Sequence, residues 1–205
     1  MRGNGKKRFV RRQPKQQRAR QTVEAVLDAV VKILKRDGID AVTTNRIAEV
    51  AGISIGSLYQ YFPDKRAIFH ALHDRHVEDI GRVVERTVIE HASSSLEQTL
   101  RALVDAMIQA HASDPELYEL LLTEVPHRNT GVRQAESRLR GALRLALSSR
   151  TRELGSRRDI EKALFVLTHM IDALVHGVVL RRPANLSVSA AKEEAMLAVV
   201  AYLRA

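Results

Sequence analysis

Cysteine is absent from the sequence, and glycine, proline and aromatic residues are scarce. Without cysteine the chain has no disulfide, thiolate zinc site, iron–sulfur ligand or cysteine nucleophile, and it suits a reducing compartment. Only 10 glycines and 5 prolines occur in 205 residues, and aromatic residues make up 4%. The dominant residues are Ala, Leu, Val, Glu and Arg, which favours an all-helical chain over a sandwich or barrel. Since 45% of the residues are hydrophobic, the chain can bury a sizeable core, as one large domain or two small ones.

The formal net charge of +9 is concentrated in the first 20 residues, which contain no acidic residue. The basic residues there are Arg2, Lys6, Lys7, Arg8, Arg11, Arg12, Lys15, Arg18 and Arg20. The rest of the chain is formally neutral, because 33 basic residues minus these nine leave 24 against 24 acidic ones. We therefore predict that residues 1–20 form a disordered basic arm that is attracted to nucleic acid. The alternative is a solubilising tail.

The most apolar stretch, Ala163–Leu180, resembles a membrane span only in its length. It is interrupted by Thr168, His169, Asp172 and His176, and ionisable groups are costly in hydrocarbon. A buried helix of a soluble protein is the better interpretation. No apolar segment follows the basic start, so we expect no secretory signal, a cytoplasmic protein and no membrane partner.

Residues 21–66 have the layout of a helix-turn-helix module. The first helix presents an apolar stripe with helical spacing, namely Val23, Val26, Leu27, Val30, Val31 and Leu34. Thr43 can cap a short second helix that ends at Gly52. Ser54 can cap a third helix that runs to Phe62. Three helices in about 45 residues, the last two joined by a tight turn, are typical of this module.

The exposed side of the third helix is predicted to carry hydrogen-bonding groups and no charge. Its outward residues are Ser54, Ile55, Ser57, Tyr59, Gln60 and Tyr61. A solvated helix would normally carry Glu and Lys there, whereas these groups can donate to phosphates and base edges. In the alternative interpretation the tyrosines simply pack on neighbouring side chains.

The run from Thr43 to Lys65, TTNRIAEVAGISIGSLYQYFPDK, resembles the amino-terminal signature of TetR-family transcriptional regulators. The resemblance covers roughly residues 20–70. It implies an all-helical fold of about nine helices, with a DNA-binding domain over residues 21–66 and a ligand-binding and dimerisation domain over residues 67–205. It also implies a homodimer on a palindromic double-stranded DNA operator, and a small-molecule effector that changes the spacing of the two DNA-reading heads.

By position in the resembling segment, Thr43 is expected to cap the second helix and touch a phosphate, and Lys65 to meet a phosphate at the start of the fourth helix. Arg46 departs from the acidic residue that is common at its position. It lacks a favourable interaction with the helix dipole, so we expect it to contact DNA instead, together with Asn45. The full set of expected DNA contacts is Thr43, Thr44, Asn45, Arg46, Ser54, Ile55, Ser57, Tyr59, Gln60, Tyr61 and Lys65.

Six further helices are predicted in the larger domain. Their expected ranges are 64–91, 95–112, 114–125, 130–154, 158–181 and 189–203. Ser95 and Gln98 have the spacing of a capping box, and Asp114-Pro115 is a cap followed by a proline at the first helical position. The helix at 158–181 is apolar on nearly every side and must be covered all round. We therefore expect it to form, with the helix at 189–203, a four-helix bundle with the same helices of a second copy.

His169, Asp172 and His176 lie three and seven residues apart, which puts them on one face of the helix at 158–181. They could contact a ligand, or they could be buried polar groups with partners across the dimer or in the backbone. The other residues expected at a ligand pocket are Met107, His111, Tyr118, Leu121 and Phe165, and an ordinary role in the core is the alternative for each.

Two patterns suggest other chemistry and are rejected. The segment Gly52–Gly56 matches the G-x-S-x-G motif of hydrolases, but that motif requires a strand before its serine, and a helix is predicted there. His70, His73 and His76 spread over too wide an arc of one helix for a shared metal, and we expect them to be solvated. We therefore predict no enzyme activity, no cofactor and no metal. The alternative function is a DNA-binding regulator without a small-molecule ligand, constitutive or controlled by a protein partner.

Overall fold

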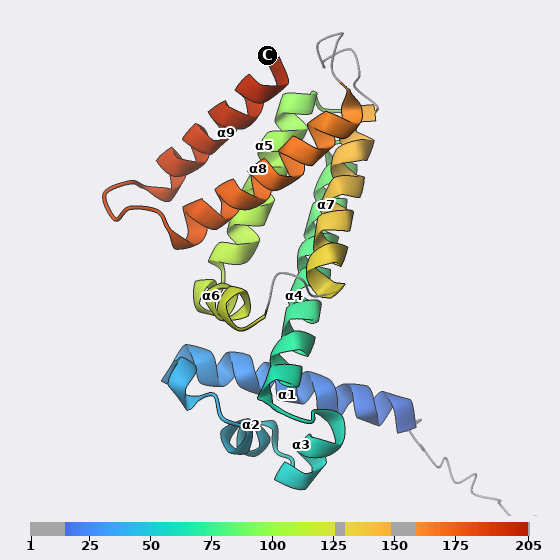
Figure 1. The fold of residues 1–205 in the computed structure, drawn as a ribbon, viewed down its shortest axis with the longest axis vertical. Helices are drawn as coiled ribbons and strands as arrows, with labels where there is room; N and C mark the ends of the chain where they lie inside the picture. The colour runs from blue at the N-terminus through green and yellow to red at the C-terminus, as the bar shows by residue number, and fades with distance from the viewer. Residues whose placement is uncertain (1–14, 126–129, 149–158, 205) are drawn as a thin grey trace, which may run out of the picture. The chain divides into compact units, whose positions relative to one another are not determined.

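The computed structural model describes residues 15–125, 130–148 and 159–204. These ranges contain helices and no strand (Figure 1). The helices are α1 (Lys15–Asp37), a short 3-10 turn (Ile39–Ala41), α2 (Thr44–Ala51), α3 (Ile55–Tyr61), α4 (Lys65–Glu90), α5 (Leu96–Ala112), α6 (Pro115–Glu124), α7 (Thr130–Ser148), α8 (Ile160–Leu180) and α9 (Val188–Arg204). The prediction of an all-helical fold is confirmed. The chain divides into two compact units between Ile68 and Phe69.

The amino-terminal unit is built on the apolar stripe of α1. Val26, Val30 and Ile33 of α1 are almost completely buried, and the helix packs against α2. Leu58 of α3 and Ile47 of α2 are also fully buried, which ties the two short helices into the same core. Burial of each such side chain contributes about 1.5–3 kcal/mol, so this small core can hold the three helices together.

Gly52 sets the turn between α2 and α3. It has φ 69° and ψ 31°, the left-handed conformation that a glycine adopts without the penalty of a Cβ. Its N–H donates to carbonyls of Ala48 and Glu49, and the N–H of Ile53 donates to the Ala48 carbonyl at 3.0 Å. The last turn of α2 is therefore closed, and the chain is redirected at once into α3.

The carboxy-terminal unit is a layer of long helices in which α8 is central. Within this unit α8 packs against α5, α6, α7 and α9, and Leu164, Leu167 and Ile171 of α8 are completely buried (Figure 1). The ends of its helices follow the expected caps. Ser95 and Gln98 form a capping box on α5, and Asp114 caps α6 ahead of Pro115.

One helix boundary differs from that expected, and one cannot be compared. Helix α1 begins at Lys15, so Lys15, Arg18 and Arg20 belong to a helix and not to a disordered arm. The remainder of the arm, residues 1–14, lies outside the described residues. Helix α7 is described to Ser148, and its expected continuation to residue 154 also lies outside them.

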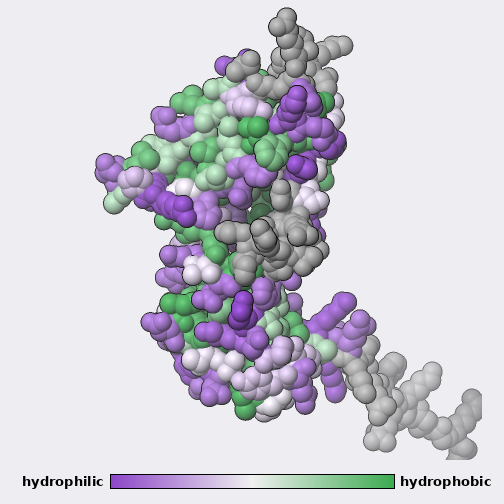
Figure 2. Space-filling view, in the orientation of Figure 1, coloured by the Kyte–Doolittle hydropathy of each residue, from purple (hydrophilic) through white to green (hydrophobic). Residues whose placement is uncertain are grey.

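Helix α8 is only partly covered within one chain. It is the one helix in the described ranges that is long and apolar enough to cross a membrane, and 39% of its most apolar window is buried. Phe165 on α8 is 56% exposed and Leu197 on α9 is 59% exposed. Figure 2 shows apolar residues gathered over these helices on the visible face. The expectation of a helix buried on all sides is therefore not met by a single copy of the chain.

Candidate DNA-binding surface and ligand pocket

Helix α3 presents the uncharged surface that its sequence predicts. Leu58 faces the core, whereas Tyr59, Gln60 and Tyr61 are exposed. Ser54 caps the helix, because its Oγ accepts a hydrogen bond from the Ser57 N–H at 3.1 Å and lies 2.8 Å from the Ser57 Oγ. None of the eleven residues expected to contact DNA is buried. Their hydroxyl, amide and basic groups are accessible on one compact unit.

The geometry of the cap argues against Ser54 as the nucleophile of a hydrolase. A nucleophile elbow places its serine after a strand, on a strained turn. Ser54 instead follows α2 and has φ −70° and ψ 151°, an ordinary extended conformation. Its hydroxyl is engaged with the backbone and side chain of Ser57. The motif is thus a helix cap.

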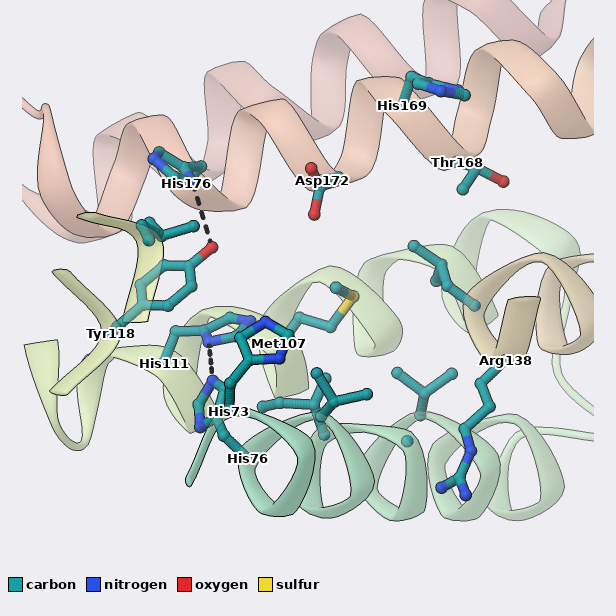
Figure 3. Close-up of a pocket in the computed structure, with 16 residues that line it drawn as sticks. His73, His76, Met107, His111, Tyr118, Arg138, Thr168, His169, Asp172 and His176 are labelled. Carbon is teal, nitrogen blue, oxygen red and sulfur yellow. Dashed lines mark hydrogen bonds between the residues drawn. The ribbon is translucent and has the colours of Figure 1, made fainter. Parts of the chain in front are cut away.

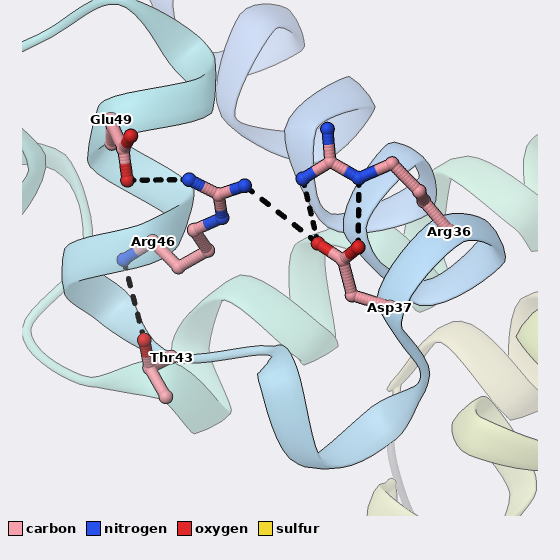
Figure 4. Close-up of polar contacts among 5 residues, drawn as sticks. All are labelled: Arg36, Asp37, Thr43, Arg46 and Glu49. Atoms are coloured by element: carbon pink, nitrogen blue, oxygen red, sulfur yellow. Dashed lines mark hydrogen bonds and ion pairs between the residues drawn. The ribbon is translucent and has the colours of Figure 1, made fainter.

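Arg46 is held by two carboxylates of the same unit (Figure 4). Its guanidinium donates to Glu49 at 2.7 Å and lies 3.8 Å from Asp37, and its backbone N–H donates to the Oγ1 of the capping Thr43 at 3.3 Å. A hydrogen bond from Arg36, together with its positive charge, lowers the pKa of Asp37. The missing helix-dipole interaction of Arg46 is therefore compensated within the protein.

Lys65 begins helix α4 at the end of the module. The preceding Asp64 caps this helix, since its Oδ1 accepts from the Ala67 N–H at 2.8 Å. Lys65 is exposed in the first turn of this helix. A helix start with an adjacent ammonium group favours an anion such as a DNA phosphate.

The carboxy-terminal unit contains a cavity of about 300 Å³ among α4, α5, α6, α7 and α8 (Figure 3). Six of the residues expected at a ligand pocket line it, and these are Met107, His111, Tyr118, His169, Asp172 and His176. Residues not expected there complete the wall, namely His73, His76, Val77, Ile80, Gly81, Val84, Leu122, Arg138, Leu139 and Thr168. The volume lies at the lower end of the range for small-molecule sites.

One end of the cavity is a chain of hydrogen-bonded rings. His76 Nε2 lies 3.2 Å from His111 Nδ1, and the Tyr118 hydroxyl lies 3.2 Å from His176 Nδ1. The His111 and Tyr118 rings stack with centroids 4.0 Å apart. The contacts join α4, α5, α6 and α8 at one point, so this end of the pocket is well defined.

Burial keeps His76, His111 and Tyr118 uncharged at neutral pH. Burial, followed by repulsion from His73, lowers the pKa of His76 to about 4. It likewise lowers the pKa of His111 to about 3, with repulsion from His76 as the next cause. Burial, followed by the negative charge of Asp172, raises the pKa of Tyr118. These three rings therefore offer neutral donors and acceptors.

Two expected pocket residues are elsewhere. Leu121 is 1% exposed and belongs to the core, but it does not line the cavity. Phe165 lies on the exposed face of α8. The expectation that Leu121 and Phe165 line the pocket is wrong. An apolar residue on a helix can pack against any of several neighbouring helices, and helical spacing does not say which one.

The interpretation of the α4 histidines as solvated is also wrong for two of them. His73 is 9% exposed, and both His73 and His76 line the cavity. A signal for this was present in the sequence, because His73, Val77, Ile80 and Val84 share one helical stripe. Histidines that continue an apolar stripe face the same interior as that stripe.

Comparison with known proteins agrees with this architecture. The description "Bacterial regulatory proteins, tetR family" matches residues 26–72, and "Tetracyclin repressor-like, C-terminal domain" matches residues 95–203. The second match alone covers more than half of the chain. An exposed helix-turn-helix joined to a larger helical unit defines a DNA-binding transcriptional regulator, and the chain belongs to the TetR family.

Individual relatives are distant. The chain is 28% identical over 99 residues to the nucleoid occlusion factor SlmA of Actinobacillus pleuropneumoniae, with 48% of each chain covered. It is 29% identical over 102 residues to the HTH-type transcriptional repressor KstR of Mycolicibacterium smegmatis, with 50% of this chain and 49% of that one covered. The chain thus matches about half the length of these curated relatives. The fold is similar to the transcriptional regulator FadR of Bacillus subtilis in complex with stearoyl-CoA, with a TM-score of 0.64 and 19% identity over 86% of this chain and 97% of that one.

Proposed function

We propose that this TetR-family regulator is a cytoplasmic repressor that binds a palindromic operator as a homodimer and is released by a small molecule. The observation that carries the proposal is the accessible, uncharged face of α3, flanked by the basic Arg46 and Lys65. A major groove presents hydrogen-bonding base edges between phosphates, and this face offers complementary donors. The DNA contacts are the eleven residues named from the sequence, on a DNA-binding domain over residues 21–66.

The homodimer is supported by the exposed apolar residues of α8 and α9. Phe165 and Leu197 would be covered if these helices packed against the same helices of a second copy. In an isologous dimer the two α3 helices would enter successive major grooves, about 34 Å apart. The KstR relative carries the name of a repressor, which supports repression as the output.

Control by a small molecule is supported by the cavity in the carboxy-terminal unit, where residues 67–205 form the ligand-binding and dimerisation domain. The FadR structure was solved with stearoyl-CoA, so a ligand occupies a protein of this fold. The cavity here, about 300 Å³, has convergent polar groups from four helices, which disfavours a regulator without a ligand. A ligand can release DNA only if it binds one head spacing more tightly than the other. No catalytic role is assigned, since the polar groups supply no nucleophile with a matched base.

The test is fluorescence anisotropy of the full chain on its own upstream intergenic DNA and on a scrambled duplex, across a salt series. Selective binding at physiological salt, with a two-fold symmetric protected site, is the expected result. Equal and steeply salt-dependent binding to both duplexes would reflect phosphate contacts alone and would contradict operator recognition at that site. The same assay repeated on genomic fragments selected by the protein extends the test to distant operators.

A further inference from the structure

Arg138 on α7 brings a guanidinium to the end of the pocket opposite Tyr118 and His176 (Figure 3). Its Nη1 lies 3.5 Å from the carbonyl oxygen of Glu78, which is a marginal hydrogen bond. Over residues 15–125, 130–148 and 159–204, no carboxylate forms an ion pair with this guanidinium. A guanidinium has five N–H donors, so most of those of Arg138 have no strong acceptor within that part of the protein.

Gly81 on α4 makes room for the Arg138 side chain. A Cβ at Gly81 would lie 2.5 Å from Arg138 Cδ and 2.6 Å from its Nη1. Any other residue at position 81 would therefore push the guanidinium away. Glycine is among the least favourable residues in a helix interior, and Gly81 lies in the middle of α4. The positions Gly141 and Gly177 are also helical, yet a Cβ there would meet nothing within 4 Å. Close approach is thus specific to Gly81.

Between the two ends, Val77 and Ile80 of α4, Met107 of α5 and Leu139 of α7 form an apolar side of the cavity, and Asp172 and His169 of α8 line the facing side (Figure 3). Along α8, Thr168 and His176 both line the cavity, and their separation corresponds to a rise of about 12 Å. The pocket is therefore polarised: a guanidinium lies at one end and hydrogen-bonding rings lie at the other, with apolar side chains of α4, α5 and α7 and the carboxyl group of Asp172 between them.

We propose that the pocket binds a small organic acid whose carboxylate pairs with Arg138, whose apolar body lies along the α4 stripe and whose hydroxyl meets Tyr118 and His176. This inference rests on the proposed function, because it names the effector class of the same pocket. One carboxylate matches one guanidinium in charge and in its planar, two-pronged geometry. A cavity of about 300 Å³ with an apolar side formed by α4, α5 and α7 suits a compact ring acid.

The test is calorimetric titration of the full chain with three probes of one frame: 3-(4-hydroxyphenyl)propanoate, the matching amide and the matching primary amine. The acid is expected to bind at least about tenfold more tightly than either, which is the scale of one charge-assisted pair. The unhydroxylated 3-phenylpropanoate is expected to bind more weakly than the hydroxylated acid.

Two substitutions assign the preference to its residues, each with a matched control. Arg138→Met should reduce the preference for acid over amide to less than about threefold, whereas Arg144→Met, which breaks a surface ion pair with Glu161, should leave it unchanged. Gly81→Ala keeps the charge but displaces it, so it should also reduce the preference. Gly141→Ala should not. Gly141→Ala should raise the melting temperature, because it replaces a helical glycine where a Cβ meets nothing within 4 Å, whereas at Gly81 the gain is offset by the displacement of Arg138.

Each possible outcome either supports or overturns the assignment of the ligand class. Equal affinity for acid and amide, equal effects of Arg138→Met and Arg144→Met, or no binding of any acid by a folded protein overturns the assignment. Operator binding is measured on the same preparations by anisotropy. If the parent protein binds operator selectively but shows no acid preference, the result counts against the ligand class alone. Acid binding without selective operator binding counts against the proposed function and leaves the ligand class standing.

Discussion

The hydroxyl of Tyr59 on α3 lies 3.4 Å from the hydroxyl of Thr44 on α2, so a weak contact joins the two helices on their exposed side. The Tyr59 side chain is half exposed and packs little against the core. Its hydroxyl is thus positioned by a neighbour and still accessible to a phosphate or base edge. A residue in this situation affects binding more than it affects folding.

Replacement of Tyr59 by phenylalanine tests that relationship. We expect operator affinity to fall by about tenfold, the scale of one hydrogen bond to a charged group, with a change of less than about 0.5 kcal/mol in the free energy of unfolding. Anisotropy on operator and scrambled duplexes measures the first quantity, and urea denaturation the second. A variant that unfolds, or that binds operator as well as the parent protein, contradicts the assignment of Tyr59 to the DNA surface.

Release of Arg46 from its carboxylate partner is predicted to strengthen DNA binding. Glu49→Gln removes a negative charge from the DNA-binding unit and weakens the hold on the guanidinium, which is 2.7 Å from Glu49. The exposed pair contributes less than about 1 kcal/mol to stability, so folding should be little changed. We expect higher affinity and a steeper salt dependence in anisotropy titrations.

The matched control for that prediction is Glu85→Gln, which makes the same charge change at an exposed position of the other unit. If both variants gain the same affinity for DNA, the change in net charge explains the gain. Arg46 would then be removed from the set of DNA contacts.

The buried histidines predict a loss of stability in mild acid. Histidine in an unfolded chain has a pKa near 6.5, whereas burial lowers that of His76 to about 4 and that of His111 to about 3. Between these values the unfolded chain binds more protons than the folded one, so stability is full above about pH 6.5 and falls as the pH drops toward about 4. The two groups together should lower the free energy of unfolding by roughly 2–4 kcal/mol at about pH 5.

Melting temperatures of His111→Gln and of the parent protein across this pH range measure the effect. The variant should lose less stability on acidification than the parent. His70→Gln, a half-exposed histidine of α4 outside the pocket, is the control and should follow the parent curve. Parallel curves for His111→Gln and the parent protein would show that other groups govern the acid transition.

The apolar faces of α8 and α9 predict that a charge will separate the dimer. Leu197→Glu places a carboxylate in the expected interface, where an unpaired buried charge costs several kcal/mol. Sedimentation should show monomers at concentrations at which the parent protein is a dimer, with loss of operator binding. Ile89→Glu changes a residue of α4 that is 69% exposed and should leave the dimer intact. A dimeric Leu197→Glu protein would place the interface elsewhere.

The sequence predicted best those features that depend on neighbours in the chain. The caps at Thr43, Ser54, Ser95 and Asp114 are confirmed because a cap is decided by a side chain and the N–H groups two or three residues beyond it. The outward face of α3 follows in the same way from helical spacing once Leu58 is assigned to the core. The apolar stripe of α1 was largely right, with Ile33 buried where Val31 was expected.

The pocket was only half predictable, because it is formed by helices far apart in the chain. The histidines and aspartate of α8 share a face that is visible in the sequence, but the opposite wall depends on which side of α4 is turned toward α5. That choice is made by packing, which the spacing of His73 and His76 alone does not encode. The close approach of Arg138 to Gly81 is a contact between α7 and α4, and no local sequence pattern predicts it.

The contact between His76 Nε2 and His111 Nδ1 couples the tautomers of the two rings. Because burial keeps both imidazoles neutral, each ring holds one proton, and only one of the two facing nitrogens can donate. If the donor role passes from one ring to the other, the outer nitrogens of both rings exchange roles as well, from acceptor to donor and from donor to acceptor. The two outer nitrogens can therefore present either hydrogen-bonding polarity to a ligand, without any movement of the backbone.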